Sequence, residues 1–140
     1  MPPRKITGSC LCGNVAFTYT GEIADAAYCH CSDCRKTTGS AFNISIGLQA
    51  DLFTISKGTP RDYTMTADSG QQLTRHFCGD CGAPLFTSSP SHPETVYVKA
   101  GALDDPGVVR PAYQSWTRSR VSWSKIADDL PGFDTDRNAG

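Results

Sequence analysis

The sequence predicts a β-rich single domain, on the evidence of period-two hydrophobic patterns, frequent turn residues and a length of 140 residues. Apolar side chains alternate with polar or small ones over 15–19, 42–48, 53–55 and 96–100, as expected of half-buried strands. Thirteen glycines and nine prolines punctuate the chain in the manner of turns. The length suits one domain with a conventional core, and is too short for two ordinary domains.

Two segments depart from the strand pattern. Ser32 to Thr38 is the segment that we expect to form a turn or two of helix. The C-terminal stretch, 130–140, has little apolar content, so we expect it to be irregular and partly mobile. The predicted organisation is therefore one mainly β domain over residues 1–140.

Composition and charge exclude several classes of protein. Hydrophobic residues make up 39% and charged residues 19%, which excludes bulk disorder. The net charge is -1, whereas a nucleic-acid-binding domain normally has a basic excess, so we expect no nucleic-acid partner. No apolar run approaches the roughly 20 residues of a membrane helix, and the first seven residues lack the apolar core of a secretory signal. We therefore expect a cytoplasmic protein with no membrane partner.

The chain contains seven cysteines, an unusual number for its size. Structural disulfides are uncommon in a reducing compartment, and an odd number of cysteines cannot all pair. Metal ligation or catalysis is the better interpretation. The cysteines fall in three blocks, at 10–12, 29–34 and 78–81.

The first and third blocks look like two halves of one zinc site. Cys10 with Cys12, and Cys78 with Cys81, are close pairs that are each followed directly by a glycine. Zinc prefers four tetrahedral ligands, and the glycine lets backbone N–H groups turn toward the thiolates. The alternative, two separate redox dithiols, is less favoured because such motifs are expected near a βαβ pattern, which this sequence lacks.

The middle block supplies the remaining cysteines as a contiguous trio, Cys29, Cys31 and Cys34. Four protein ligands are typical of a structural zinc, and three ligands with a vacant position are typical of a catalytic one. The count therefore favours two zinc ions per chain, one in a closed and one in an open site. Cys29 and Cys31 could instead join Cys78 and Cys81, which would leave a scattered and poorer chelating trio.

Basic residues and histidines flank the trio and the third block. Arg35 and Lys36 follow directly on the trio, where two cations favour the thiolate and can hold the carboxylates of an anionic substrate. For Lys36 a solvated basic turn is an equal alternative. His30 lies between two candidate ligands, so we expect it to point away from their metal and to make a packing or supporting contact. His76, on a predicted strand, is expected to be structural.

Three segments together resemble the glutathione-dependent formaldehyde-activating enzyme (GFA) family, whose superfamily includes centromere protein V. They are GSCLCG at 8–13, CHCSDCRKTTGSAF at 29–42 and RHFCGDCGAPLF at 75–86. The likeness covers a core of about residues 6–133. Gln114 stands where many members have histidine.

The resemblance implies a β-tent fold of small antiparallel sheets held by zinc. It also implies how the cysteines divide between a structural and a catalytic zinc. The structural ligands would be Cys10, Cys12, Cys78 and Cys81, and the catalytic ligands Cys29, Cys31 and Cys34. The implied activity joins glutathione to formaldehyde, which is carbon–sulfur lyase chemistry.

The residues argue for the same chemistry. A zinc ion held by three thiolates is a poor Lewis acid and suits a fourth, soft ligand, so an incoming thiol would bind as the thiolate and add to an aldehyde carbon. We expect a glutathione-like thiol and an aldehyde as partners. The alternatives are a zinc-ribbon-like binding module, a thiol carrier without turnover, and a redox sensor that uses the trio as free thiols.

Overall fold

A computed structural model describes residues 4–126 and 128–137 of the chain. These residues form ten strands, one α-helix and four short 3-10 helices. The strands are β1 (Arg4–Ser9), β2 (Ala16–Gly21), β3 (Ala26–Cys29), β4 (Asn43–Gln49), β5 (Phe53–Lys57), β6 (Arg61–Thr66), β7 (Gln72–Phe77), β8 (Pro84–Ser88), β9 (Thr95–Lys99) and β10 (Pro111–Ser115). The helices are α1 (Ser32–Thr38), η1 (Ala50–Leu52), η2 (Ala100–Ala102), η3 (Pro106–Val108) and η4 (Thr117–Ser119).

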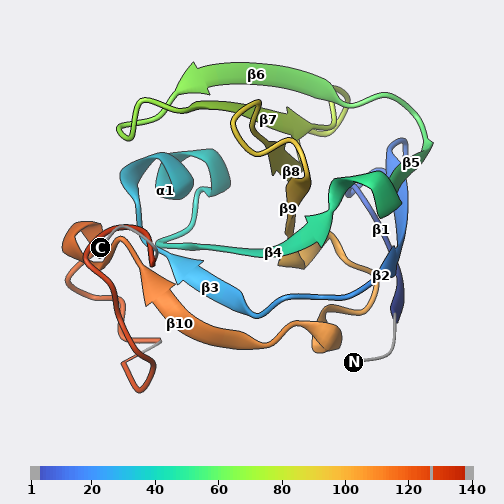
Figure 1. The fold of residues 1–140 in the computed structure, drawn as a ribbon. Coiled ribbons are helices and arrows are strands. Elements are labelled where there is room, and N and C mark those ends of the chain that lie inside the picture. The colour runs from blue at the N-terminus through green and yellow to red at the C-terminus, as the bar shows by residue number, and fades with distance from the viewer. Residues whose placement is uncertain (1–3, 127, 138–140) are drawn as a thin grey trace.

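The strands make two sheets. The smaller sheet has the order β1-β2-β5, and the larger has the order β10-β3-β4-β9-β8-β7-β6. Neighbouring strands are antiparallel, except that β10 runs parallel to β3. Figure 1 shows the larger sheet curving around α1, from β10 at the bottom to β6 at the top, with the smaller sheet on the right. The predicted mainly β fold and the predicted helix at Ser32 to Thr38 are confirmed.

The core lies between the two sheets, and strand alternation explains why. Ile46 of β4 and Val98 of β9 pair across the larger sheet and are fully buried, as is Phe17 of β2 in the smaller sheet. Phe53 of β5 joins the two layers, because its ring centroid lies 5.3 Å from that of Phe17 and 4.9 Å from that of Phe86 on β8. One face of each sheet is thereby used for packing.

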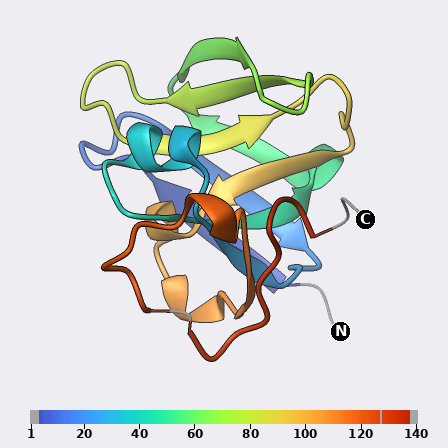
Figure 2. The ribbon, with the colours of Figure 1, turned by 90° about the vertical axis from the view of Figure 1, so that its left-hand side faces the viewer.

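The opposite face of the larger sheet is polar, and it is the face that carries α1. The residues that alternate with the buried ones include Asn43 and Ser45 of β4 and Lys99 of β9. They lie on the concave side of the curved sheet. Figure 2, turned so that this side faces the viewer, shows α1 at the front between the two ends of the sheet.

The C-terminal segment is irregular, as predicted, but part of it is tied to β10. Its backbone runs beside β10, where Gln114 N–H donates to the carbonyl of Pro131 at 2.8 Å and Phe133 N–H donates to the carbonyl of Gln114 at 3.0 Å. Trp116 N–H donates in the same way to Thr135 at 3.1 Å. Apart from the isolated bridge between Gly132 and Gln114, residues 131–135 form no helix or strand, so the expected irregular end is confirmed there, while 138–140 lie outside the described residues. Within the described ranges, no helix has the length and apolar character needed to cross a membrane.

Candidate functional site

The first and third cysteine blocks meet at one point, as predicted. The sulfur atoms of Cys10, Cys12, Cys78 and Cys81 all lie within 4.8 Å of one another. Neighbouring sulfurs are 3.6 Å apart between Cys10 and Cys12, and 3.7 Å apart between Cys12 and Cys78. Zinc–sulfur bonds of about 2.3 Å in a tetrahedron place sulfurs about 3.8 Å apart. The cluster therefore has the dimensions of a closed zinc site.

The two halves of this cluster are built alike. Cys10 N–H donates to the carbonyl of Val15 at 3.0 Å, and Cys78 N–H donates to the carbonyl of Ala83 at 3.0 Å, five residues on in both cases. Each turn needs a residue in the left-handed region, and a glycine supplies it with φ of 80° at position 13 and 78° at position 82. The glycine that follows each cysteine pair thus has the role that the sequence predicted.

Backbone N–H groups point at the sulfurs of this cluster. Val15 N lies 3.3 Å from Cys10 Sγ, and Cys81 N lies 3.5 Å from Cys78 Sγ. Hydrogen bonds from the backbone of Ala83 and of Cys12 lower the pKa of Cys81 to about 6. Such donors stabilise thiolates and so favour the charge state that a metal needs.

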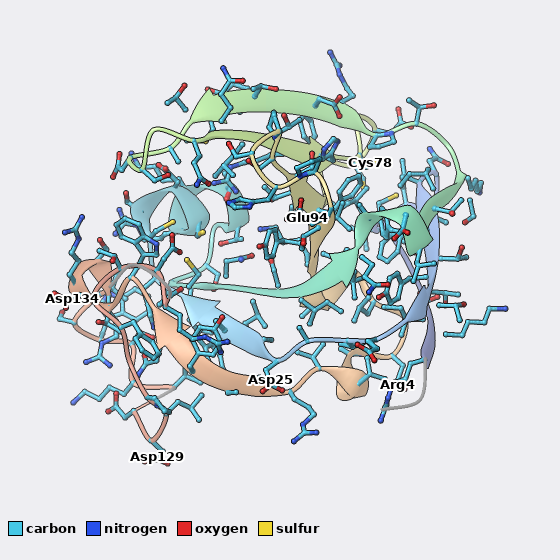
Figure 3. All side chains as sticks on the ribbon, viewed as in Figure 1. Arg4, Asp25, Cys78, Glu94, Asp129 and Asp134 are labelled. Atoms are coloured by element: carbon cyan, nitrogen blue, oxygen red, sulfur yellow. The ribbon has the colours of Figure 1, made fainter. Side chains whose placement is uncertain are left out.

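The trio forms a second and separate cluster at the start of α1. Cys29 ends β3, Cys31 is the N-cap of α1, and Cys34 lies in the first turn, with all three sulfurs within 4.8 Å of one another. Cys34 N–H donates to Cys31 Sγ at 3.2 Å, so the capping atom is itself a candidate ligand. Figure 3 shows this group of sulfur atoms beside α1, well apart from the group near Cys78.

The three thiols of this cluster are strongly coupled. The sulfurs of Cys34 and Cys29 are 3.5 Å apart. Hydrogen bonds from Cys31 and Cys34 lower the pKa of Cys29 to about 3, whereas the hydrogen bond to Cys29 raises the pKa of Cys34 well above its usual range. One thiolate forms readily and its neighbours retain their protons. A divalent cation that replaced those protons would suit this donor set, and three soft ligands leave a fourth zinc position for another group.

The residues expected to support the trio have varied surroundings. His30 is only 1% exposed, and its Nε2 lies 3.0 Å from Oε1 of Gln114, in line with the packing or supporting contact that we predicted. His76 stacks on Phe86 with ring centroids 4.1 Å apart and its Nε2 lies 2.8 Å from Ser88 Oγ, in line with the structural role that we predicted. Arg35 and Lys36 lie on α1. Their assignment as substrate contacts stays a prediction.

Two cavities flank the C-terminal half of α1. The larger, of about 500 Å³, has Thr38 on its wall, and the smaller, of about 300 Å³, has Thr37. Lys99 lines both cavities, Asn43 lines the larger and Arg75 the smaller. Sequence reasoning did not single out these three residues. The sequence feature that could have identified Asn43 and Lys99 is the alternation of polar and apolar residues in β4 and β9. This alternation places both residues on the face opposite the core.

The fold and the two clusters define a small β protein with two groups of cysteines that could each hold a metal ion. The family model described as "Glutathione-dependent formaldehyde-activating enzyme" matches residues 5–119. The chain therefore belongs to the glutathione-dependent formaldehyde-activating enzyme family, as the sequence motifs predicted.

Individual relatives are distant. Two proteins named "Putative glutathione-dependent formaldehyde-activating enzyme" match 59% of the chain, one from Fusarium vanettenii at 26% identity and one from Penicillium rubens at 28%. The DNA primase small subunit PriS of Natronomonas pharaonis is 34% identical over 51% of the chain. The matches cover 43%, 42% and 19% of these proteins, less than half of each.

A solved structure supports the fold. The crystal structure of a Rhodobacter sphaeroides protein superposes with a TM-score of 0.56 and covers 91% of this chain and 98% of its own. Its sequence identity is 20%, so the likeness concerns the fold alone.

Proposed function

We propose that this protein is a zinc-dependent carbon–sulfur lyase-type enzyme that binds a glutathione-like thiol at the trio and adds it to formaldehyde or a related aldehyde. The observation that carries the proposal is the trio itself. It is a cluster of three cysteines on the polar face of the larger sheet, apart from a closed four-cysteine cluster. A plain zinc scaffold needs only the closed cluster.

The trio would hold the catalytic zinc and the four-cysteine cluster the structural zinc. Zinc bound to Cys29, Cys31 and Cys34 would supply a position for the sulfur of an incoming thiol and favour its deprotonation. The chain's own residues fix the geometry. Cys31 is held by the N-terminus of α1, and the Ser115 side chain hydrogen-bonds Cys29 and lowers its pKa, after the larger effects of Cys31 and Cys34.

The reaction balances without any further reactant. The sulfur lone pair of the thiolate forms the new C–S bond to the aldehyde carbon, and the carbonyl π pair moves to oxygen. The proton released by the thiol ends on that oxygen, which gives a hemithioacetal. The reverse step cleaves the C–S bond, as a lyase does. No group is oxidised or reduced, which fits a site built on zinc.

Arg35 and Lys36 are the proposed contacts for a substrate carboxylate, because α1 places them directly after Cys34. We propose that residues 6–133 act as one zinc-binding unit, since the segment after 130 returns to β10. A cytoplasmic location is supported by the seven cysteines, all of which lie among the described residues as free thiols and so suit a reducing compartment.

The test is exchange spectroscopy by NMR on glutathione mixed with formaldehyde, where the spontaneous reaction sets the baseline. We expect the zinc-loaded protein to accelerate exchange between glutathione and its hydroxymethyl adduct, and Cys34→Ser to remove the acceleration while the fold persists. If the protein bound glutathione stoichiometrically but did not accelerate the exchange, it would be a thiol carrier and not an enzyme. A protein that binds no thiol and one zinc ion per chain would be a binding module, and the proposal would fail.

A further inference from the structure

Two basic side chains outside the trio share the face of the larger sheet that carries α1. In the register of the sheet, Arg75 of β7 is opposite Tyr63 on one side and Thr87 on the other, and Thr87 is opposite Tyr97. Lys99 lies two residues beyond Tyr97 on β9, so strand alternation gives it the same side of the sheet. Both cations line the cavity of about 300 Å³.

No carboxylate forms an ion pair with either cation within the ranges 4–126 and 128–137. Lys99 is only 8% exposed, and its Nζ donates to Oδ1 of Asn43 at 2.6 Å. Nε of Arg75 contacts Sδ of Met65 at 3.5 Å. Asp62, on the neighbouring strand, is hydrogen-bonded to His76 at 2.7 Å.

Burial of a positive charge is costly without a counter-charge. Burial lowers the pKa of Lys99 and Arg75 lowers it further, whereas the three cysteines of the trio raise it. An anion in the cavity would offset the repulsion between the two cations and favour the charged form of Lys99. The cavity is thus suited to a negatively charged group.

The cavity lies close to the trio. Thr37 on its wall is three residues after Cys34 on α1, so the two positions are one helical turn, about 5 Å, apart along the helix axis. Asn43, the partner of Lys99, is also the cross-strand neighbour of Cys29. A ligand bound through sulfur at the trio can therefore place a group a few bonds away in this cavity.

We propose that Arg75 and Lys99 form a carboxylate-binding subsite for the thiol substrate, distinct from the contact proposed for Arg35. This inference rests on the proposed function, since it takes the trio as the site of the thiol. It narrows the substrate to thiols that carry a carboxylate several bonds from sulfur, at the end of a flexible chain. Glutathione has two carboxylates, so one can meet Arg35 and the other the pair formed by Arg75 and Lys99.

The experiment is calorimetric titration of the zinc-loaded protein with three probes. Glutathione has a thiol and carboxylates, 2-mercaptoethanol has only the thiol, and S-methylglutathione has only the carboxylates. The variants are Arg75→Gln and Lys99→Met, which remove a charge at similar volume, and Lys99→Arg, which keeps it. Lys57→Met is the matched control, because Lys57 is exposed on β5 of the other sheet.

We expect Arg75→Gln and Lys99→Met each to weaken glutathione by about ten- to hundred-fold, the range for one lost charge-assisted hydrogen bond. S-methylglutathione should weaken in parallel. Binding of 2-mercaptoethanol should be unchanged in both variants, and every probe should bind Lys57→Met as it binds the natural chain. Lys99→Arg should retain most of the affinity for glutathione.

Two results would overturn the subsite. Equal weakening of glutathione and 2-mercaptoethanol would mean that the two cations support the metal centre. Unchanged glutathione binding in both charge-removing variants would mean that they face no carboxylate, while the proposed function would stand. If neither thiol binds the natural chain, the proposed function fails. S-methylglutathione then tests the anion-binding subsite alone. The subsite is supported if the natural chain binds S-methylglutathione and the variants do not, and it is refuted if the natural chain does not bind this probe.

Discussion

The division of the cysteines into a structural and an open site makes a quantitative prediction about stability. A metal that joins Cys12 to Cys78 closes a loop of 66 residues, whereas one that joins Cys29 to Cys34 closes a loop of 5. In the chain-entropy model, the long closure is worth about 4 kcal/mol and the short one about 2 kcal/mol. We therefore expect Cys78→Ser to lower the free energy of unfolding by at least about 2 kcal/mol more than Cys31→Ser.

Local structure adds to this difference. Cys78 is fully buried in the core, and its sulfur accepts hydrogen bonds from the backbone of Asp80 and Cys81. Cys31 is half-buried and caps α1, and serine is a good N-cap residue, so Cys31→Ser preserves the start of the helix. Cys31→Ser therefore loses stability mainly because the short loop between Cys29 and Cys34 is no longer closed by a metal.

The assay is thermal unfolding with zinc content measured on the same samples. For a chain of this length, about 1 kcal/mol corresponds to about 3 °C in Tm, so Cys78→Ser should lower Tm by about 12 °C and Cys31→Ser by about 6 °C. Each variant should lose one zinc ion of two. The division of the cysteines would be refuted if both variants lost the same stability, or if Cys31→Ser released both metals.

Three further outcomes are expected. Zinc release to a mild chelator should be biphasic, because the open site offers an exchangeable position. Cys29→Ser should abolish the fast phase, and a single phase in the natural protein would contradict the presence of two different sites. Arg35→Ala should weaken glutathione by about 1.5–3 kcal/mol and leave 2-mercaptoethanol unchanged in titrations, with Lys57→Ala as the control; equal loss for both thiols would assign Arg35 to the metal loop. Phe53→Ala should lower the free energy of unfolding by about 3 kcal/mol, because its ring packs on both sheets; a loss below about 1 kcal/mol in denaturant would mean that the sheets are held together elsewhere.

The two cysteine clusters could be predicted from the sequence because their geometry is largely local. A pair of cysteines followed by glycine specifies its own turn, and the positive φ at positions 13 and 82 is the local conformation that glycine permits. The trio is also local, since Cys31 and Cys34 belong to the first turn of α1. Only the contact between the first and third cysteine blocks depends on the fold. The sequence could still suggest this contact, because the two cysteine pairs together supply the four ligands of a closed zinc site.

The cationic cavity could not be predicted in this way because it depends on strand register. Arg75 and Lys99 are brought together by β7, β8 and β9, and their distance in sequence gives no sign of this. The same holds for the place where the irregular C-terminal segment returns to β10. That contact rests on backbone hydrogen bonds to Gln114, which the polarity of the side chains does not predict.

The larger cavity lies between the four-cysteine cluster and the C-terminal end of α1, and no cysteine of the trio lines it. Cys10, Leu11 and Ala83, at the four-cysteine cluster, lie on one part of its wall, while Thr38 and Asn43 lie on another. Leu11 is 89% exposed, so only the turn that holds Cys10 fixes its position. A metal held by the closed cluster would therefore order one side of this cavity.

The four-cysteine cluster should therefore affect ligand binding indirectly, through the wall of the larger cavity, whereas the trio should bind the thiol directly. Leu11 lines the larger cavity together with Lys99 of the proposed carboxylate subsite. Cys12→Ser frees the turn that carries Leu11, so it should weaken glutathione. Leu11→Ser leaves the ligands in place and is the matched variant for the cavity wall alone. Titration of both at a temperature where both are folded separates the cases. If Cys12→Ser retained full affinity, the closed cluster would serve stability only, and the cavity wall would owe its order to the sheets.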